Sequence, residues 1–330
     1  MFSGQAWRLL EFGAPETSLH LQETSLPDPK PGQVLIRVRS AGAGYPDALM
    51  AAGQFPLLGE PPFGLGEEAA GEVVAVPTGS PFKVGDRVTG ITAFLEGWGG
   101  YAEYTYLRQE STIPIPKAMT DDQAGGFPIG FRTAYAGLVE RTRLEAGQTL
   151  VVLGAAGSSG GAAMQLGKAL GAWVIAVAGG PEKLDFCLRH GADQVIDHRG
   201  EDVAARIVEF TDGRGADVVY DPVGGKTATA ALGGIARGGR IVLIGLASGS
   251  TVPLDSMDML MRNYTAVGVL ATPGSPDVEA AAWSRLAELA AVGEISTPVG
   301  RVYDFAEVPR MVAGQTSPGA GKSVVRISGS

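Results

Sequence analysis

A glycine-rich turn near the middle of the chain has residue types and a spacing that can hold a phosphate. The segment Ala155-Ala156-Gly157-Ser158-Ser159-Gly160 follows an apolar run at 149–154 and overlaps the start of a helix-like run at 158–171. In such a turn Gly157 lets the backbone approach a pyrophosphate, and Gly160 lets the helix pack closely on the strand. The N–H groups that begin the helix attract the phosphate charge. We therefore expect a dinucleotide here; a purely structural turn is the alternative, because the chain contains 49 glycines.

The end of the next apolar run, at 173–179, bears on which dinucleotide would bind. NAD sites carry Asp or Glu at this position to hold the ribose hydroxyls, whereas this chain has Ala178 and Gly179. Small residues leave room for a 2′-phosphate, and Lys183 can meet its charge. The sequence therefore predicts NADPH as the cofactor, with an exposed helix lysine as the alternative interpretation of Lys183.

Alternating strands and helices must position these residues. From about Thr120 onward, apolar strands alternate with helices of ~10–15 residues, which is typical of a parallel sheet covered on both faces. The expected strands of this part are 149–154, 173–179, 194–198, 217–225, 240–246 and 265–270. Before it, Pro and Gly separate short strands at 34–42, 71–76, 86–92 and 101–107. We predict an α/β fold in which a doubly wound domain interrupts a β-rich domain built from both chain ends.

Composition narrows the classes of partner. The chain has 330 residues, 45% hydrophobic and 18% charged, which is typical of about two folded domains. Its net charge of −9 disfavours nucleic acid and anionic membranes. The longest uncharged run, 146–167, contains six glycines, which favours strand, turn and helix over a membrane span. The single cysteine, Cys187, fits a reducing compartment, so we expect a cytoplasmic protein. Because nucleic acid and membranes are disfavoured as partners, we expect a small-molecule substrate.

Ordered motifs along the chain resemble those of one enzyme superfamily. They are SAGAGYPDALMAAGQFP, PFGLGEEAAGEVVAV, KVGDRVTG, GGYAEY, FRTAYAGL, GAAGSSGGAAMQLGKALGA, YDPVGG and GGRIVLIGL. In this order they resemble the medium-chain dehydrogenase/reductase superfamily and its zinc-free NADPH:quinone oxidoreductase and enoyl reductase branch. The resemblance implies a GroES-like catalytic domain (1–121 and 294–330) around a Rossmann domain (122–293). It also implies a homodimer, with the fifth and sixth Rossmann strands at its edge.

The chain departs from the zinc enzymes of that superfamily. Those enzymes place Cys, His and a second Cys or Asp at a catalytic metal, and the matching positions here are Gly44, Glu67 and Ile129. Glu67 could ligate a metal, but one carboxylate cannot build a three-ligand site. We therefore expect no metal, and no alcohol oxidation that depends on a Lewis acid.

Hydride transfer to an electrophilic acceptor needs less assistance, because the substrate's own oxygen delocalises the developing charge. The expected reaction is NADPH-dependent reduction of a quinone or an α,β-unsaturated carbonyl. An enoyl-thioester reductase is the alternative. A non-catalytic, crystallin-like NADPH-binding protein is a second alternative of another class.

The resemblance places several candidate residues at the reaction site. Tyr45 lies in the segment that faces the nicotinamide and is interpreted as either a proton donor or an aromatic wall. Thr133 matches a threonine near the nicotinamide. Trp98 and Phe131 are candidate walls for a planar substrate, or core residues. Arg132 is either an exposed cation or a group that orients the substrate carbonyl.

Further residues are expected around the cofactor. Gly245-Leu246 and Val269-Leu270 end predicted strands at the carboxyl edge of the sheet, where ligands bind in open α/β folds. By resemblance, His198 falls beside the adenosine 2′-phosphate, with Arg199 nearby. Lys322 matches a basic position close to the cofactor, with a surface lysine as the alternative.

Overall fold

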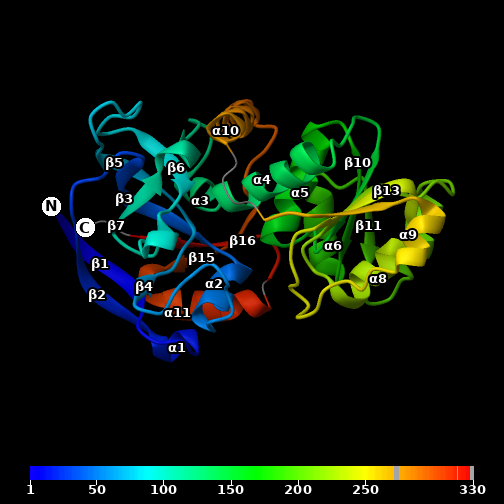
Figure 1. The fold of residues 1–330 in the computed structure, drawn as a ribbon, viewed down its shortest axis with the longest axis horizontal. Helices are drawn as coiled ribbons and strands as arrows, with labels where there is room; N and C mark the ends of the chain where they lie inside the picture. The colour runs from blue at the N-terminus through cyan, green and yellow to red at the C-terminus, as the bar shows by residue number, and fades with distance from the viewer. Residues whose placement is uncertain (271–274, 318, 328–330) are drawn as a thin grey trace. The chain divides into compact units, whose positions relative to one another are not determined.

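The computed structural model describes residues 1–270, 275–317 and 319–327. The chain divides into two compact units: a β-rich unit (1–129, 273–318 and 322–330) and a Rossmann unit (130–272 and 319–321). Both combine helices with strands, as the expected α/β class requires (Figure 1). Residues 271–274, 318 and 328–330, which the expected ranges 122–293 and 294–330 include, lie outside the described part of the chain.

The Rossmann unit is built on a parallel sheet with the strand order β11-β10-β9-β12-β13-β14. Its strands are β9 (Thr149–Leu153), β10 (Trp173–Ala178), β11 (Gln194–Asp197), β12 (Ala216–Asp221), β13 (Ile235–Leu243) and β14 (Thr265–Gly268). This is the order of a doubly wound dinucleotide-binding sheet, in which the strand order reverses between the parallel neighbours β9 and β12. The prediction of a doubly wound parallel sheet is therefore confirmed.

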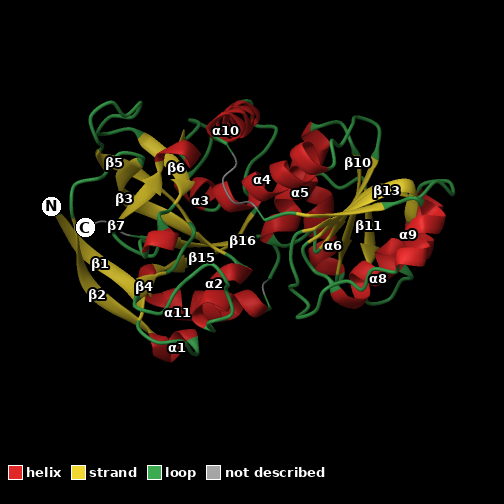
Figure 2. Cartoon of the chain, viewed as in Figure 1, coloured by secondary structure: helices red, strands yellow, loops and turns green. Residues whose placement is uncertain are grey.

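Helices cover both faces of this sheet (Figure 2). They are α5 (Ser158–Ala169), α6 (Pro181–Arg189), α7 (Val203–Phe210), α8 (Gly225–Gly233) and α9 (Ser256–Arg262). On one face, Val151 and Ile175 of the strands pack with Ile207 of α7 and Ala231 of α8. On the other, α5 crosses so closely at Gly167 that a Cβ there would lie 2.4 Å from the Leu150 side chain. Side chains that alternate along the strands thus bury both faces.

Two strand boundaries differ most from those expected. β12 ends at Asp221 rather than running to 225, because the carboxylate of Asp221 accepts hydrogen bonds from the N–H groups of Val223 and Gly224 and turns the chain. β13 begins at Ile235, before the expected start at 240.

The β-rich unit contains two sheets. The larger follows the order β15-β16-β3-β5-β6-β8, with β7 also paired to β3, and the smaller follows β2-β1-β4. The strands are β1 (Phe2–Leu9), β2 (Leu19–Leu26), β3 (Gln33–Ala43), β4 (Phe63–Gly64), β5 (Glu68–Ala75), β6 (Arg87–Ile91), β7 (Tyr104–Arg108), β8 (Ile113–Pro114), β15 (Val299–Asp304) and β16 (Lys322–Arg326). Because β16 pairs with β3, the two chain ends form one sheet, as expected.

Helices and turns join these strands. They are α1 (Pro15–Ser18), α2 (Tyr45–Ala51), η1 (Phe94–Glu96), η2 (Gln109–Ser111), α3 (Asp121–Gly125), α10 (Pro276–Ala291), η4 (Phe305–Glu307), α11 (Val308–Ala313) and η5 (Gly314–Thr316). The expected boundaries put 122–129 and the α10 segment in the Rossmann domain; in the structure both belong to the β-rich unit. None of the described helices is long and apolar enough to cross a membrane.

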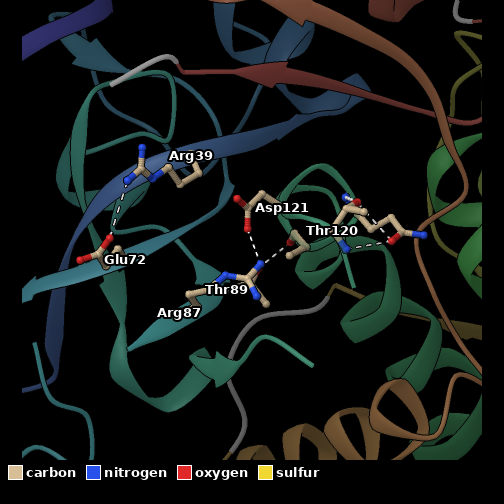
Figure 3. Close-up of polar contacts among 8 residues, drawn as sticks. Arg39, Glu72, Arg87, Thr89, Thr120 and Asp121 are labelled. Carbon is tan, nitrogen blue, oxygen red and sulfur yellow. Dashed lines mark hydrogen bonds and ion pairs between the residues drawn. The ribbon is translucent and has the colours of Figure 1, made fainter. Parts of the chain in front are cut away.

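Polar contacts hold the short helix α3 against the large sheet (Figure 3). The Arg87 guanidinium on β6 lies 2.5 Å from the Asp121 carboxylate in the first turn of α3. The Thr89 hydroxyl donates to the Ala124 carbonyl at 2.6 Å. Thr120 caps the helix by accepting the N–H of Gln123. These contacts help to fix the segment that leads to Ile129.

Candidate functional site

The glycine-rich turn has the geometry of a phosphate-binding turn. Gly157 is the N-cap of α5, has extended backbone and offers no side chain to cap the helix. The N–H groups of the first turn are therefore left for a ligand, and no acidic side chain occupies that turn. A Cβ at Gly160 would lie 2.3 Å from the Gly154 carbonyl oxygen, so only glycine allows this approach of helix and strand.

Neighbouring residues complete the turn. Ala156 is buried, and the Ser159 hydroxyl lies 2.8 Å from the Tyr220 hydroxyl of β12. Ser158 begins α5 and is half-buried. The two serines thus fit the turn without disturbing the backbone path.

Basic and polar groups surround the end of β10. His198 and Arg199 are exposed, and their side chains lie over Gly179: a Cβ there would meet Arg199 Nε at 2.7 Å and His198 Nε2 at 2.8 Å. Lys183 lies in α6, which begins at Pro181. The Asp197 carboxylate accepts the N–H groups of Gly180 and Arg199, and these hydrogen bonds help keep its pKa below the usual value.

These residues fit the 2′-phosphate of an adenosine. Lys183 and Arg199 supply positive charge, His198 supplies a ring nitrogen, and Gly179 supplies a position without a side chain. The four belong to the Rossmann unit, so their arrangement does not depend on the other unit.

The carboxyl ends of β13 and β14 are accessible. Gly245, Leu246 and Leu270 are exposed, and Val269 is half-buried. A cavity of about 220 Å³ is lined by Arg132, Ala136, Glu140, Arg141, Gly268, Val269 and Leu270. It adjoins the π-helical segment η3 (Ala136–Arg141), which follows α4 (Pro128–Tyr135). Such π-helical turns are frequent at functional sites.

The structure settles several of the alternatives left open by the sequence. Arg132 is buried and lies 3.2 Å from the Glu140 carboxylate, so its interpretation as an exposed cation is wrong. Phe131 is buried in the Rossmann unit, in agreement with a core role. Trp98 packs edge-to-face on Tyr106 with ring centroids 5.5 Å apart, within a small core cluster of the β-rich unit. Thr133 is half-buried on α4.

In the β-rich unit, Tyr45 and Asp47 share the first turn of α2. One Asp47 oxygen accepts the N–H of Gly44 at 2.8 Å, and the other accepts the N–H of Gly66 at 3.0 Å. Asp47 thus ties the helix start to the strand entry. Burial raises its pKa to about 6. Tyr45 is half-buried, and its hydroxyl makes no hydrogen bond with any residue that the structure describes.

The next acidic residues lie where the chain enters β5. Glu68 forms an ion pair with Lys322 of β16, and its other oxygen accepts the N–H of Ile129 at 2.8 Å. Lys322 is only 3% exposed, so the alternative of a surface lysine is wrong. Glu67 is 8% exposed, and burial, together with the negative charges of Asp47 and Glu68, raises its pKa well above the usual value.

Close backbone packing brings these groups together. Gly66 has φ +98° and lies so near Gly100 that a Cβ would be 2.9 Å from its nitrogen. Tyr101 follows in the same segment; it is fully buried, and its hydroxyl donates to the Gly42 carbonyl at 3.2 Å. Burial and the carboxylates of Asp47, Glu68 and Glu67 raise the pKa of this phenol. We call Asp47, Glu67, Glu68, Tyr101 and Lys322 the buried ionisable cluster.

Sequence reasoning did not find this cluster. Its members come from separate parts of the sequence: α2, the entry to β5, the segment that precedes β7, and the strand β16. Their spacing along the sequence therefore does not indicate that these segments meet. The available signal was the pair Glu67-Glu68 at the start of an otherwise apolar segment, where acids are uncommon unless partnered.

The positions that hold zinc in metal-dependent relatives give no ligand set here. Gly44 has no side chain, Ile129 is apolar and only Glu67 could bind a metal. Among the residues that the structure describes, no group of three or more His, Cys, Asp or Glu side chains is placed to hold a metal ion. The absence of a bound metal in the active protein stays a prediction.

Comparison with known proteins places the chain among dehydrogenases. The family described as "Alcohol dehydrogenase GroES-like domain" matches residues 30–117, and the family "Zinc-binding dehydrogenase" matches residues 160–288. The second match spans none of positions 44, 67 and 129, so its name does not bear on the metal. A quinone oxidoreductase of Pseudomonas aeruginosa is 34% identical over 305 residues, which cover 91% of this chain and 92% of that protein.

Solved structures agree over nearly the whole chain. A quinone oxidoreductase of Pseudomonas syringae has a TM-score of 0.86 at 27% identity, with 98% of this chain and 100% of that chain covered. A mycobacterial protein determined in complex with NADPH gives the same TM-score, identity and coverage. The similarity therefore spans both units of the chain.

Proposed function

This chain belongs to the quinone oxidoreductase branch of the medium-chain dehydrogenase/reductase superfamily, and we propose that it reduces a quinone or an α,β-unsaturated carbonyl with NADPH. Membership makes it an oxidoreductase; the cofactor and the acceptor are the proposed part. The observation that carries the cofactor is the position of His198 and Arg199 over Gly179, at the strand end where NAD sites carry an acid. Lys183, in the first turn of the following helix α6, adds a positive charge to this part of the Rossmann unit.

The Rossmann unit would hold NADPH along one edge of its sheet. The first turn of α5, with Ala156, Gly157, Ser158, Ser159 and Gly160, would bind the pyrophosphate. Gly179, Lys183 and His198 would take the adenosine end. Thr133 and the strand ends Gly245, Leu246, Val269 and Leu270 would lie toward the nicotinamide, and Lys322 stays a proposed contact of the cofactor.

When bound, NADPH supplies a hydride, and the protein's task is to orient the acceptor and exclude water. Tyr45, Trp98, Phe131 and Arg132 are the proposed substrate contacts. Arg132 could orient the substrate carbonyl from the wall of the 220 Å³ cavity, where its charge is balanced by Glu140. Phe131 would act from the core, as a support for that wall, because its ring is buried.

An enoyl-thioester reductase remains the second candidate, because the same hydride step serves a C=C bond conjugated to a thioester. A crystallin-like NADPH-binding protein without turnover is the candidate of another class. A homodimer joined at the exposed edge strand β14 and a cytoplasmic location complete the proposal.

Steady-state NADPH oxidation tests this function. The purified chain is offered a panel of quinones, enones and enoyl thioesters, with NADH in a parallel series. We expect turnover of quinones or enones with a clear preference for NADPH. Saturable NADPH binding without turnover of any acceptor would instead favour the non-catalytic candidate.

A further inference from the structure

Two hydroxyl groups meet at the phosphate turn of the Rossmann unit. The Ser159 hydroxyl, in the first turn of α5, lies 2.8 Å from the Tyr220 hydroxyl, near the end of β12. The turn follows β9, and β12 pairs with β9 at the point where the strand order reverses. A doubly wound sheet binds its dinucleotide at that reversal. The hydroxyl pair therefore lies at the proposed cofactor site and within a single unit of the chain.

The two hydroxyls differ in their access to a ligand. Tyr220 is fully buried, and its ring packs so near the main chain of η3 that a Cβ at Gly137 would lie 3.1 Å from it. Pairing with Val152 of β9 holds the backbone of Tyr220 in register. Ser159, by contrast, is half-buried. A ligand at the turn can thus contact Ser159, whereas Tyr220 has no accessible surface to offer.

The direction of the hydrogen bond follows from counting protons. Each hydroxyl carries one proton, so one group donates in this contact and the other accepts. If Ser159 donated, the Tyr220 proton would be buried without an acceptor, since Ser159 is the sole hydrogen-bond partner of this phenol among the residues that the structure describes. A buried donor without an acceptor is unfavourable. If Tyr220 donates, both groups are satisfied, because the half-buried Ser159 can give its own proton to water or to a ligand.

We propose that Tyr220 is a positioning residue of the cofactor site: its hydroxyl donates to Ser159 and so directs the Ser159 proton toward the pyrophosphate of the dinucleotide. The inference rests on the proposed NADPH site and adds a side-chain donor to the N–H groups of α5. A hydroxyl that accepts one hydrogen bond becomes a stronger donor in its own, and a charged phosphate oxygen is a favourable acceptor. Tyr220 acts on the cofactor only through Ser159.

The part of the cofactor that the pair contacts sets which ligands should respond. The pyrophosphate is common to NADPH and NADH, so the pair should raise the affinity for both alike. Lys183, in contrast, should act on NADPH alone. Adenosine 2′-monophosphate carries the 2′-phosphate but no pyrophosphate, and its affinity should therefore not depend on Ser159.

The first test determines the direction of the hydrogen bond without a cofactor. The C–O stretching band of a phenol moves in opposite directions when its hydroxyl donates and when it accepts. Infrared difference spectra of protein with isotope-labelled tyrosine, wild type against Tyr220→Phe and against Ser159→Ala, isolate the Tyr220 band. We expect the position of a donor. The position of an acceptor would overturn the proposal, and the Ser159→Ala spectrum decides this even if Tyr220→Phe folds poorly.

The second test measures affinity by isothermal titration. We expect Ser159→Ala to weaken NADPH and NADH alike, by about tenfold, and to leave adenosine 2′-monophosphate within about twofold. Tyr220→Phe should weaken both cofactors by about fivefold. Ser159→Thr, which keeps a hydroxyl, should retain most of the affinity. Ser256→Ala, at the start of α9, and Tyr104→Phe, in the β-rich unit, are the matched controls.

The double variant separates positioning from structural support. If Tyr220 acts through Ser159, Tyr220→Phe should change the affinity by less than about twofold once Ser159 is replaced by alanine. An equal loss with and without the Ser159 hydroxyl would show that Tyr220 only supports the fold, and would overturn the proposal. Unchanged affinity in Ser159→Ala would also overturn it, while the proposed NADPH site would stand. A wild type that binds neither cofactor would overturn both that site and this inference.

Discussion

Lys322 and Glu68 form a buried ion pair that joins β16, near the end of the chain, to the start of β5. Both side chains are almost inaccessible, at 3% and 2%. A Cβ at Gly42 would lie within 2.9 Å of both side chains, so a larger residue at this position would require the ion pair to move. The pair thus joins the two chain ends within one sheet.

Breaking this pair from one side should be costly. Lys322→Met leaves Glu68 buried without its counter-charge, and we expect a loss of about 3–5 kcal/mol in the free energy of unfolding. The double variant Glu68→Gln with Lys322→Met should recover much of that loss, since no unpaired charge remains. Urea unfolding measures both. A single variant as stable as the wild type would show that the pair contributes little.

Lys183 should determine part of the cofactor preference. Lys183→Ala removes a positive charge from the first turn of α6. We expect NADPH affinity to fall roughly tenfold, equivalent to about 1–2 kcal/mol, with NADH affinity unchanged. Isothermal titration with each cofactor measures this. Lys117→Ala, an exposed lysine of the β-rich unit, is the control. Equal binding of the two cofactors by the wild type would contradict the prediction.

The purified protein should contain no stoichiometric zinc and should keep its activity in a chelator. The reason is the donor set: Gly44 and Ile129 offer no ligand atoms from their side chains, and Glu67 alone cannot hold the ion. Elemental analysis beside an activity assay checks this. One zinc per chain, lost together with activity, would refute it.

The stability of the protein should depend on pH through Glu67. Its pKa is raised in the folded state, so between its ordinary value of 4.5 and the folded value the native protein keeps a proton that the unfolded chain has released. The stability from this group is complete below that ordinary value and is lost as pH rises toward the folded value. Relative to Glu67→Gln, the wild type should lose about 1.4 kcal/mol per pH unit in this window.

Urea midpoints of both proteins between about pH 5 and pH 8 give the difference. Asp47, whose pKa is raised to about 6, changes stability in the same direction in both proteins and largely cancels. A stability difference that does not vary with pH would show that Glu67 is ionised in the folded protein.

The sequence alone determined the features that depend on local pattern. Runs of apolar residues with helical segments between them predicted the strands β9 to β14, because a strand covered on both faces must be apolar throughout. Gly157 and Gly160 marked the phosphate turn, because their lack of a side chain is visible in the sequence itself. The absence of an acid after Ala178 could be found in the same way, since it lies at a set distance from the turn.

Only the tertiary structure decided the burial and pairing of the charged residues. Lys322 and Glu68 are more than 250 positions apart in the sequence, and they meet because β16 pairs with β3 and β3 with β5. Likewise, Arg132 is buried against Glu140 because a π-helical turn follows α4. The environment of a charge depends on every segment folded around it, and for Glu67 those segments are α2, β5 and β16. Neighbours in sequence therefore indicated the strands and helices, while neighbours in space raised the pKa of Glu67.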